Sequence, residues 1–139
     1  MKSLDSVIRF QEWKLDEKRR KVADLERLAQ SLHDKIARLD IEMRTEQKAA
    51  SENLLVASAY DNYASEVLKR RQKLLRSLAD IEVEMTKAMN EVAAAYGEFK
   101  KLDLMRNRDR ERTEYLEKRR KQNKPEETGR GKPFRRTSR

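Results

Sequence analysis

From Leu4 to Leu102 apolar residues recur at alternating steps of three and four, which is a heptad repeat. Residues spaced 3.5 apart on average form a narrow stripe along a helix, and such a stripe drives helices to pair lengthwise. No glycine occurs before Gly97 and no proline before Pro125. The pattern predicts an all-α coiled coil. One core position of the heptad, called a here, falls on Ile8, Leu15, Val22, Ala29, Ile36, Met43, Ala50, Ala57, Ala64, Arg71, Leu78, Met85, Val92 and Phe99. The other, called d, falls on Leu4, Gln11, Lys18, Leu25, Leu32, Leu39, Glu46, Asn53, Tyr60, Val67, Leu74, Ile81, Ala88, Ala95 and Leu102.

The core stripe is weakest near the middle of the chain, where Glu46 and Asn53 occupy d positions. Small polar residues gather in the same region and compete locally for backbone hydrogen bonds. We therefore expect one helix over about 3–48, a turn within 50–62 and a second helix over about 62–121. The polar residues of this region are Ser51, Asn53, Ser58, Asp61 and Asn62.

Two arrangements satisfy the repeat. An antiparallel hairpin over 1–121, paired about residue 55, opposes Ile8 with Leu102 and Leu32 with Leu78, although a shift by one heptad fits about as well. The heptad phase is unbroken, so a single continuous helix in a parallel dimer satisfies the same pattern. The weak stretch favours the hairpin.

Charge accumulates at the end of the chain. Of the formal net charge of +9, most comes from 117–139, where ten Lys and Arg face three Asp and Glu. The segment 122–139 contains both prolines and has no apolar periodicity, so we expect a disordered basic tail. Such a tail either binds nucleic acid or an anionic membrane through phosphates, docks on an acidic protein surface, or only keeps the chain soluble.

Candidate chemistry is sparse. The chain has no cysteine and one histidine, and it has no Gly-rich phosphate loop, nucleophile–base set or metal-ligand spacing. We expect no catalysis, no cofactor and no metal. It also has no apolar run of 18 residues and no apolar stretch of a secretory signal within Met1–Phe10, so the expected location is the cytoplasm.

Two sets of apolar residues fall outside the core positions. The second predicted helix has Leu68, Leu75, Met89 and Tyr96 at the heptad position after d, called e, which is usually charged. These residues either broaden the helix contact, become buried in a dimer or dock another protein. Phe10 and Trp13 lie three apart near the N-terminus, facing away from the core, and an exposed Trp is a favoured interface anchor.

The ordered combination of several segments resembles the flagellar FliJ proteins, across about residues 1–122. The segments are Leu15-Asp16-Glu17-Lys18-Arg19-Arg20-Lys21-Val22-Ala23-Asp24-Leu25-Glu26-Arg27-Leu28, the polar Ala-rich middle, Ala59-Tyr60 with Tyr63-Ala64, and Glu98-Phe99-Lys100-Lys101-Leu102-Asp103 before an Arg-rich end.

The resemblance implies a two-helix antiparallel coiled coil similar to the central stalk of rotary F-type ATPases. It implies a role in the flagellar type III export apparatus, at the cytoplasmic face of the inner membrane. Expected partners are the hexameric export ATPase, the membrane export gate and export chaperones. By surface logic, Phe10, Trp13 and the basic stretch 106–121 are candidates for the ATPase ring, and the e-position residues for the gate or chaperones. The basic candidates are Arg106, Arg110, Lys118, Arg119, Arg120 and Lys121.

Overall fold

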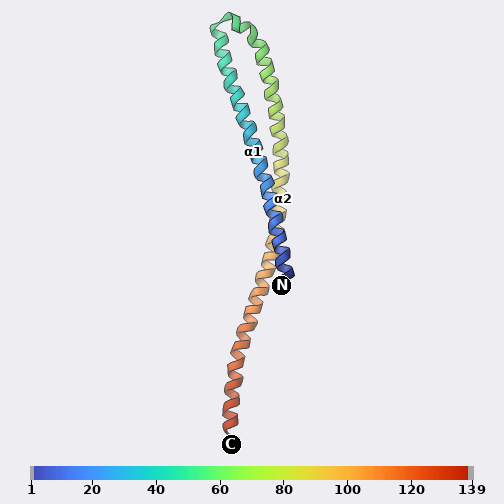
Figure 1. The fold of residues 1–139 in the computed structure, drawn as a ribbon, viewed down its shortest axis with the longest axis vertical. Helices are drawn as coiled ribbons and strands as arrows, with labels where there is room; N and C mark the ends of the chain where they lie inside the picture. Colours follow the sequence, from blue (N-terminus) through green and yellow to red (C-terminus); the bar gives the residue numbers. More distant parts are fainter. Residues whose placement is uncertain (1, 138–139) are drawn as a thin grey trace. The chain divides into compact units, whose positions relative to one another are not determined.

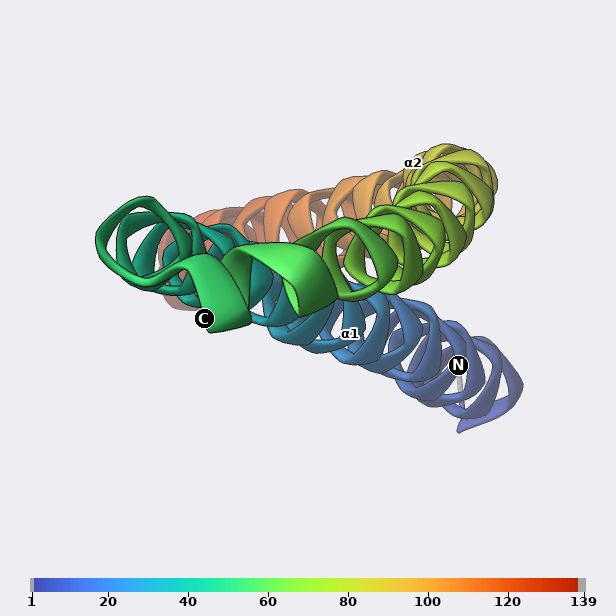
Figure 2. The same cartoon turned by 90° about the horizontal axis from the view of Figure 1, so that it is seen from above.

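A computed structural model describes the backbone of residues 2–137 and the side chains of residues 3–123. This part of the chain consists of two α-helices, α1 (Lys2–Glu52) and α2 (Leu54–Thr137). The helices pack against each other in opposite directions and are joined by the turn drawn in green in Figure 1, onto which Figure 2 looks from above. The predicted all-α antiparallel hairpin is confirmed, and the alternative of one continuous helix is wrong.

The contacts divide the chain into two compact units. The central unit is Trp13–Ala95, which contains the turn and most of both paired helices. The terminal unit combines Met1–Glu12 with Tyr96–Arg139. The hairpin domain predicted over 1–121 thus contributes to both units, and each is described separately below.

The predicted core stripe forms the contact between the helices. Every a and d residue from Leu4 to Leu102 is buried or half-buried except Glu46 and Asn53, the two polar residues of the weak stretch. The hairpin has only two layers of helix, so pairing buries only the side chains of the core stripe. The other faces of both helices stay exposed to solvent. The buried residues of the described part of the chain all lie at a or d: Ile8, Leu15, Ile36, Leu39, Val67, Leu78, Ala88 and Ala95.

The turn falls at Asn53, within the predicted range 50–62. Asn53 is the one residue between the helices, and its Oδ1 accepts a hydrogen bond from the backbone N–H of Leu55 at 3.0 Å. Its backbone carbonyl accepts from the N–H of Ala57, also at 3.0 Å. Asn53 is therefore the N-cap of α2, because its side chain satisfies an N–H group that the first helical turn leaves without a partner.

The second helix begins at Leu54 rather than near residue 62. Of the polar residues expected to break the helix, Ser51 and Ser58 do not do so, because their hydroxyls bond within it. Ser51 Oγ donates to the carbonyl of Lys48 at 2.6 Å, and Ser58 Oγ donates to the carbonyl of Leu55 at 2.9 Å. At the other end, the described backbone of α2 reaches Thr137, within the basic tail that the sequence predicts to be disordered over 122–139. The side chains of 124–139 lie outside the described residues.

Ion pairs across the hairpin define its register. In the central unit Arg71 Nε lies 2.9 Å from Asp40 Oδ1, and Lys18 Nζ lies 3.1 Å from Glu91 Oε2. The midpoints of these pairs are residues 55.5 and 54.5. In the terminal unit Arg106 lies 3.9 Å from Asp5, with a midpoint of 55.5. Both units therefore adopt the register about residue 55, and the register shifted by one heptad is excluded.

Replacing Gly97 with Ala is predicted to stabilise the protein. Gly97 lies within α2, and a Cβ added there meets no atom within 4 Å. Ala costs less backbone entropy in a helix, so the free energy of unfolding in urea should rise by about 0.5–1 kcal/mol. The control Ala94→Gly, at an exposed helical position, should lower it by a similar amount. A fall in stability for Gly97→Ala would show that the added methyl group meets an obstacle.

Candidate partner-binding surface

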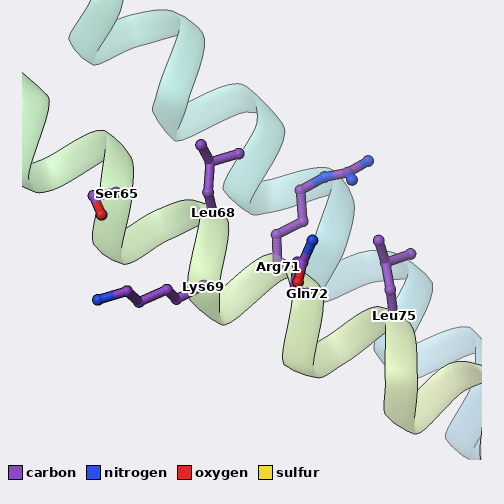
Figure 3. A pocket seen from close by; sticks show the side chains of 6 residues that line it. All are labelled: Ser65, Leu68, Lys69, Arg71, Gln72 and Leu75. Carbon is purple, nitrogen blue, oxygen red and sulfur yellow. The ribbon is translucent and has the colours of Figure 1, made fainter.

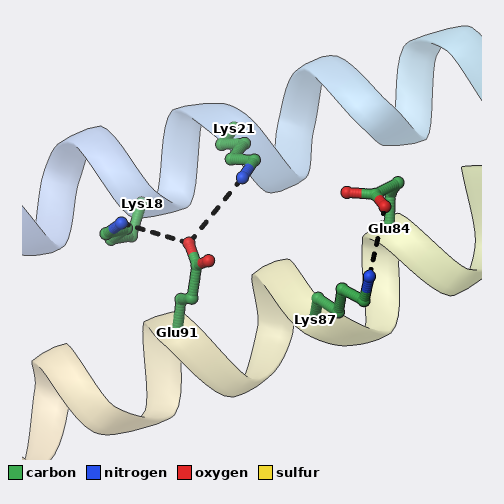
Figure 4. A network of polar contacts seen from close by, with 5 residues as sticks. All are labelled: Lys18, Lys21, Glu84, Lys87 and Glu91. Carbon is green, nitrogen blue, oxygen red and sulfur yellow. Dashed lines mark hydrogen bonds and ion pairs between the residues drawn. The ribbon is translucent and has the colours of Figure 1, made fainter.

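The two long sides of the central unit differ in chemistry. One side is formed by the g positions, which precede a, and charged residues face each other across it. Glu91 on α2 contacts Lys18 at 3.1 Å and Lys21 at 3.8 Å (Figure 4). The hydrogen bond from Lys18, and then the charges of Lys18 and Lys21, lower the pKa of the Glu91 carboxyl. On this side, ion pairs between α1 and α2 bridge the two helices.

The opposite side is formed by the e positions, and here most of the e residues of α2 are apolar. Leu68, Leu75 and Met89 remain 50%, 39% and 49% exposed, so the hairpin does not bury them. They recur at multiples of seven residues and therefore lie along one line of the helix. We call these three residues the e strip. Apolar side chains aligned in this way on an otherwise charged helix are typical of a surface that another chain covers.

A groove lies along the first part of the e strip. Its volume is about 350 Å³, and its walls come from α2. Figure 3 shows Leu68 and Leu75 projecting on the same side of α2 while Arg71 reaches toward α1, where it pairs with Asp40. Arg71 is held by the hairpin, and Lys69 lies 3.7 Å from Glu66. The groove offers the apolar contacts of its two leucines beside Ser65 and Gln72.

The remaining predicted apolar residues divide between the units. Tyr96 and Phe10 belong to the terminal unit and are 47% and 56% exposed, whereas Trp13 belongs to the central unit and is 59% exposed. Each therefore presents an aromatic surface, as the sequence predicts. The structure places Phe10 and Tyr96 in the same unit and assigns Trp13 to the unit that carries the e strip.

The basic candidates fall into two groups. Arg106 occupies an a position and is engaged within the terminal unit, where it lies 2.7 Å from Asp103 and 3.9 Å from Asp5. It acts in the hairpin contact rather than as an outward-facing cation. Arg110 is exposed and lines a cavity of about 230 Å³ beside Arg106. Every residue of 111–123 is exposed, including the basic run Lys118, Arg119, Arg120 and Lys121.

Sequence reasoning missed the most exposed apolar side chains of the described chain. Leu54 and Leu55 open α2 and are 90% and 83% exposed. The sequence could have revealed them, because two adjacent leucines stand beside the predicted turn, where no opposite helix is available to cover them. Among residues 3–123 no other adjacent pair of apolar side chains is as exposed, so the turn presents a small apolar tip.

Within the described residues no group of three or more His, Asp or Glu side chains lies close enough to hold a metal ion. The same part of the chain contains no helix long and apolar enough to cross a membrane. No family model, curated protein or solved structure matches the sequence or the fold.

Shortening a leucine to alanine should lower the stability more in the core stripe, which we also call the seam, than in the e strip. Leu78→Ala removes a core side chain that is 7% exposed and should lower the free energy of unfolding by about 2–3 kcal/mol. Leu75→Ala makes the same chemical change on the e strip and should cost less than about 1 kcal/mol, because part of the side chain already contacts water. Urea denaturation of the two variants measures the difference. Equal losses would mean that the e strip belongs to the core.

Lys18→Met should raise the pKa of the Glu91 carboxyl toward its ordinary value, which a carboxyl-carbon NMR titration measures. A lowered pKa in the folded state stabilises the protein above the pKa of the unfolded state, and this contribution is lost as the pH falls through the folded value. The variant should therefore lose less stability on acidification. Arg20→Met, which removes a cation 2.9 Å from Glu17, is the control and should leave the pKa of Glu91 unchanged.

Proposed function

We propose that this protein is a non-enzymatic stalk and adaptor of the flagellar type III protein export apparatus. It inserts into the hexameric export ATPase ring and couples the ring to the membrane export gate and to export chaperones. It works at the cytoplasmic face of the inner membrane. The proposal joins the resemblance to the FliJ proteins with a fold of the kind that the resemblance implies.

One observation carries the proposal. The two helices bury the core stripe against each other, whereas the e strip stays exposed. The buried stripe holds the two helices together without a partner. The e strip remains outside this contact, on a chain with no candidate catalytic chemistry, which favours a protein that acts by binding. The e strip is thus the candidate surface for the gate or a chaperone.

The ends of the helices supply the candidate surface for the ATPase ring. The terminal unit contains the first turns of α1 with Phe10, and the part of α2 that includes 106–121. In the register about residue 55, α2 passes the start of α1 near residue 108, and 111–123 is accordingly exposed on all sides. A single basic helix of this kind has its backbone hydrogen bonds satisfied and its side chains available to a surrounding acidic surface.

The alternative function is binding of nucleic acid or an anionic membrane through the basic end. The exposed run of four cations at 118–121 favours it, because successive cations are suited to phosphates. Removing 117–139 should then abolish salt-sensitive binding to DNA, RNA or anionic vesicles. Binding retained by the truncated chain would reject the basic end as the binding element.

The purified full-length protein should bind its cognate hexameric export ATPase and raise the rate of ATP hydrolysis. Replacing five cations of the basic end with Gln should remove most of the stimulation, because the charges that attract the ring are lost. These five are Arg110, Lys118, Arg119, Arg120 and Lys121.

The matched control removes five exposed cations of the central unit and should leave stimulation near the level of the unaltered chain. These are Lys35, Arg38, Lys48, Lys73 and Arg76. Coupled ATPase assays and co-purification give the two readouts. A chain that neither binds nor stimulates the ATPase would overturn the proposed function.

A further inference from the structure

The e strip continues into a second seam on α2. Next to the e positions lie the b positions, and the combined set recurs at steps of three and four, as a core seam does. The b residues from 65 to 93 are exposed, and none is charged. Two adjacent seams on one helix are typical of a helix that contacts two others, of which α1 is one. The b residues are Ser65, Gln72, Ala79, Thr86 and Ala93.

One charge interrupts this second seam. Glu82 occupies the e position between Leu75 and Met89. In the observed register α1 brings Glu26, also at an e position, within about one helical turn of the level of Glu82. Neither carboxylate forms an ion pair with any residue of the described part of the chain. Asp40 on the same side, by contrast, is paired with Arg71.

The charge of Glu82 distinguishes two candidate occupants of the e side, a second copy of this chain and a different protein. An antiparallel second copy that opposes Leu75 with Met89 also opposes Glu82 with its own counterpart, and like charges in such a contact are unfavourable. A partner helix that places a Lys or Arg at this level meets two carboxylates that have no other cation. Charge complementarity therefore favours a different chain over self-association.

We infer that the e side of the central unit, over residues 65–93, docks an amphipathic helix of a partner protein. The partner helix has apolar residues at heptad spacing and one basic residue at the centre of its apolar stripe. Its apolar residues cover Leu68, Leu75 and Met89, and its cation lies between Glu82 and Glu26. Apolar anchors supply the affinity, and the central charge pair selects the partner and its register.

A charge-exchange experiment with synthetic peptides tests the inference on the full-length chain. Two fluorescent 28-residue amphipathic helices differ at one central position of the apolar stripe, Lys in one and Glu in the other. Fluorescence anisotropy should show that the Lys peptide binds on the order of fivefold or more tightly than the Glu peptide. The Glu82→Lys chain should abolish this preference, because the introduced cation offsets the remaining charge of Glu26. Leu75→Asp should abolish binding of both peptides.

Two control variants separate this site from general effects of charge and apolarity. Asp80→Lys makes the same change of charge two residues away, at an exposed position on another face of α2, and should leave the preference unaltered. Leu28→Asp alters a 53% exposed leucine on the g side and should leave the affinity unaltered. Circular dichroism verifies that each variant keeps its helix content.

Three results would overturn the inference. They are equal binding of the two peptides by the unaltered chain, a preference that Asp80→Lys abolishes as well as Glu82→Lys does, and a concentration-dependent dimer in sedimentation that Glu82→Gln strengthens. The last result would identify a second copy as the occupant. The inference does not depend on the flagellar role: the peptide experiment can fail while the chain still stimulates the ATPase, and the reverse also holds.

Discussion

The structure depends on a seam two residues wide that contains cations at three core positions. Lys18 and Arg71 interrupt the apolar stripe and Arg106 follows its end, and each lies beside a carboxylate of the opposite helix. The apolar residues supply most of the driving force for pairing, but they fit a shift of one heptad about as well. Such half-exposed ion pairs contribute little stability each. A shift of one heptad would place His33 or Gln47 opposite Arg71 in place of Asp40, whereas Lys18 would still meet a glutamate, Glu84 or Glu98. The apolar stripe therefore pairs the helices, and the pair of Arg71 with Asp40 favours the observed register.

Once the register is set, the chemistry of the two sides follows from it. In the central unit the g positions bring Lys21 to Glu91, so one side is closed by attraction between the helices. On the other side α2 presents leucine and methionine where a two-helix coil usually has charges. A hairpin that had only to hold itself together would gain nothing from this exposed apolar strip. We attribute the strip to a third helix, and the proposed role in export gives such a helix a biological source.

Heptad spacing predicted the helices and the core stripe, because burial along a two-helix contact depends on little more than periodicity. It left the register about residue 55 and a shift of one heptad equally open. It could not choose between a hairpin and a continuous helix, since the phase is unbroken through Asn53. That choice rests on the cap that Asn53 makes and on pairing between residues far apart in the chain. The e strip could be recognised in the sequence, because its apolar residues occupy heptad positions that are usually charged. The engagement of Arg106 was not, because it depends on the position of Asp5 across the hairpin.

The most direct test of the central claim is the distance between spin labels at exposed positions 31 and 79, which the register places nearly opposite each other in the central unit. Double electron–electron resonance should give a distance below about 30 Å, the spacing of two packed helices plus the reach of the labels. Dilution with unlabelled chain should leave this distance unchanged, because both labels lie on one hairpin. A distance of about 72 Å, expected for 48 residues of continuous helix, would contradict the account. So would a short distance that disappears on dilution.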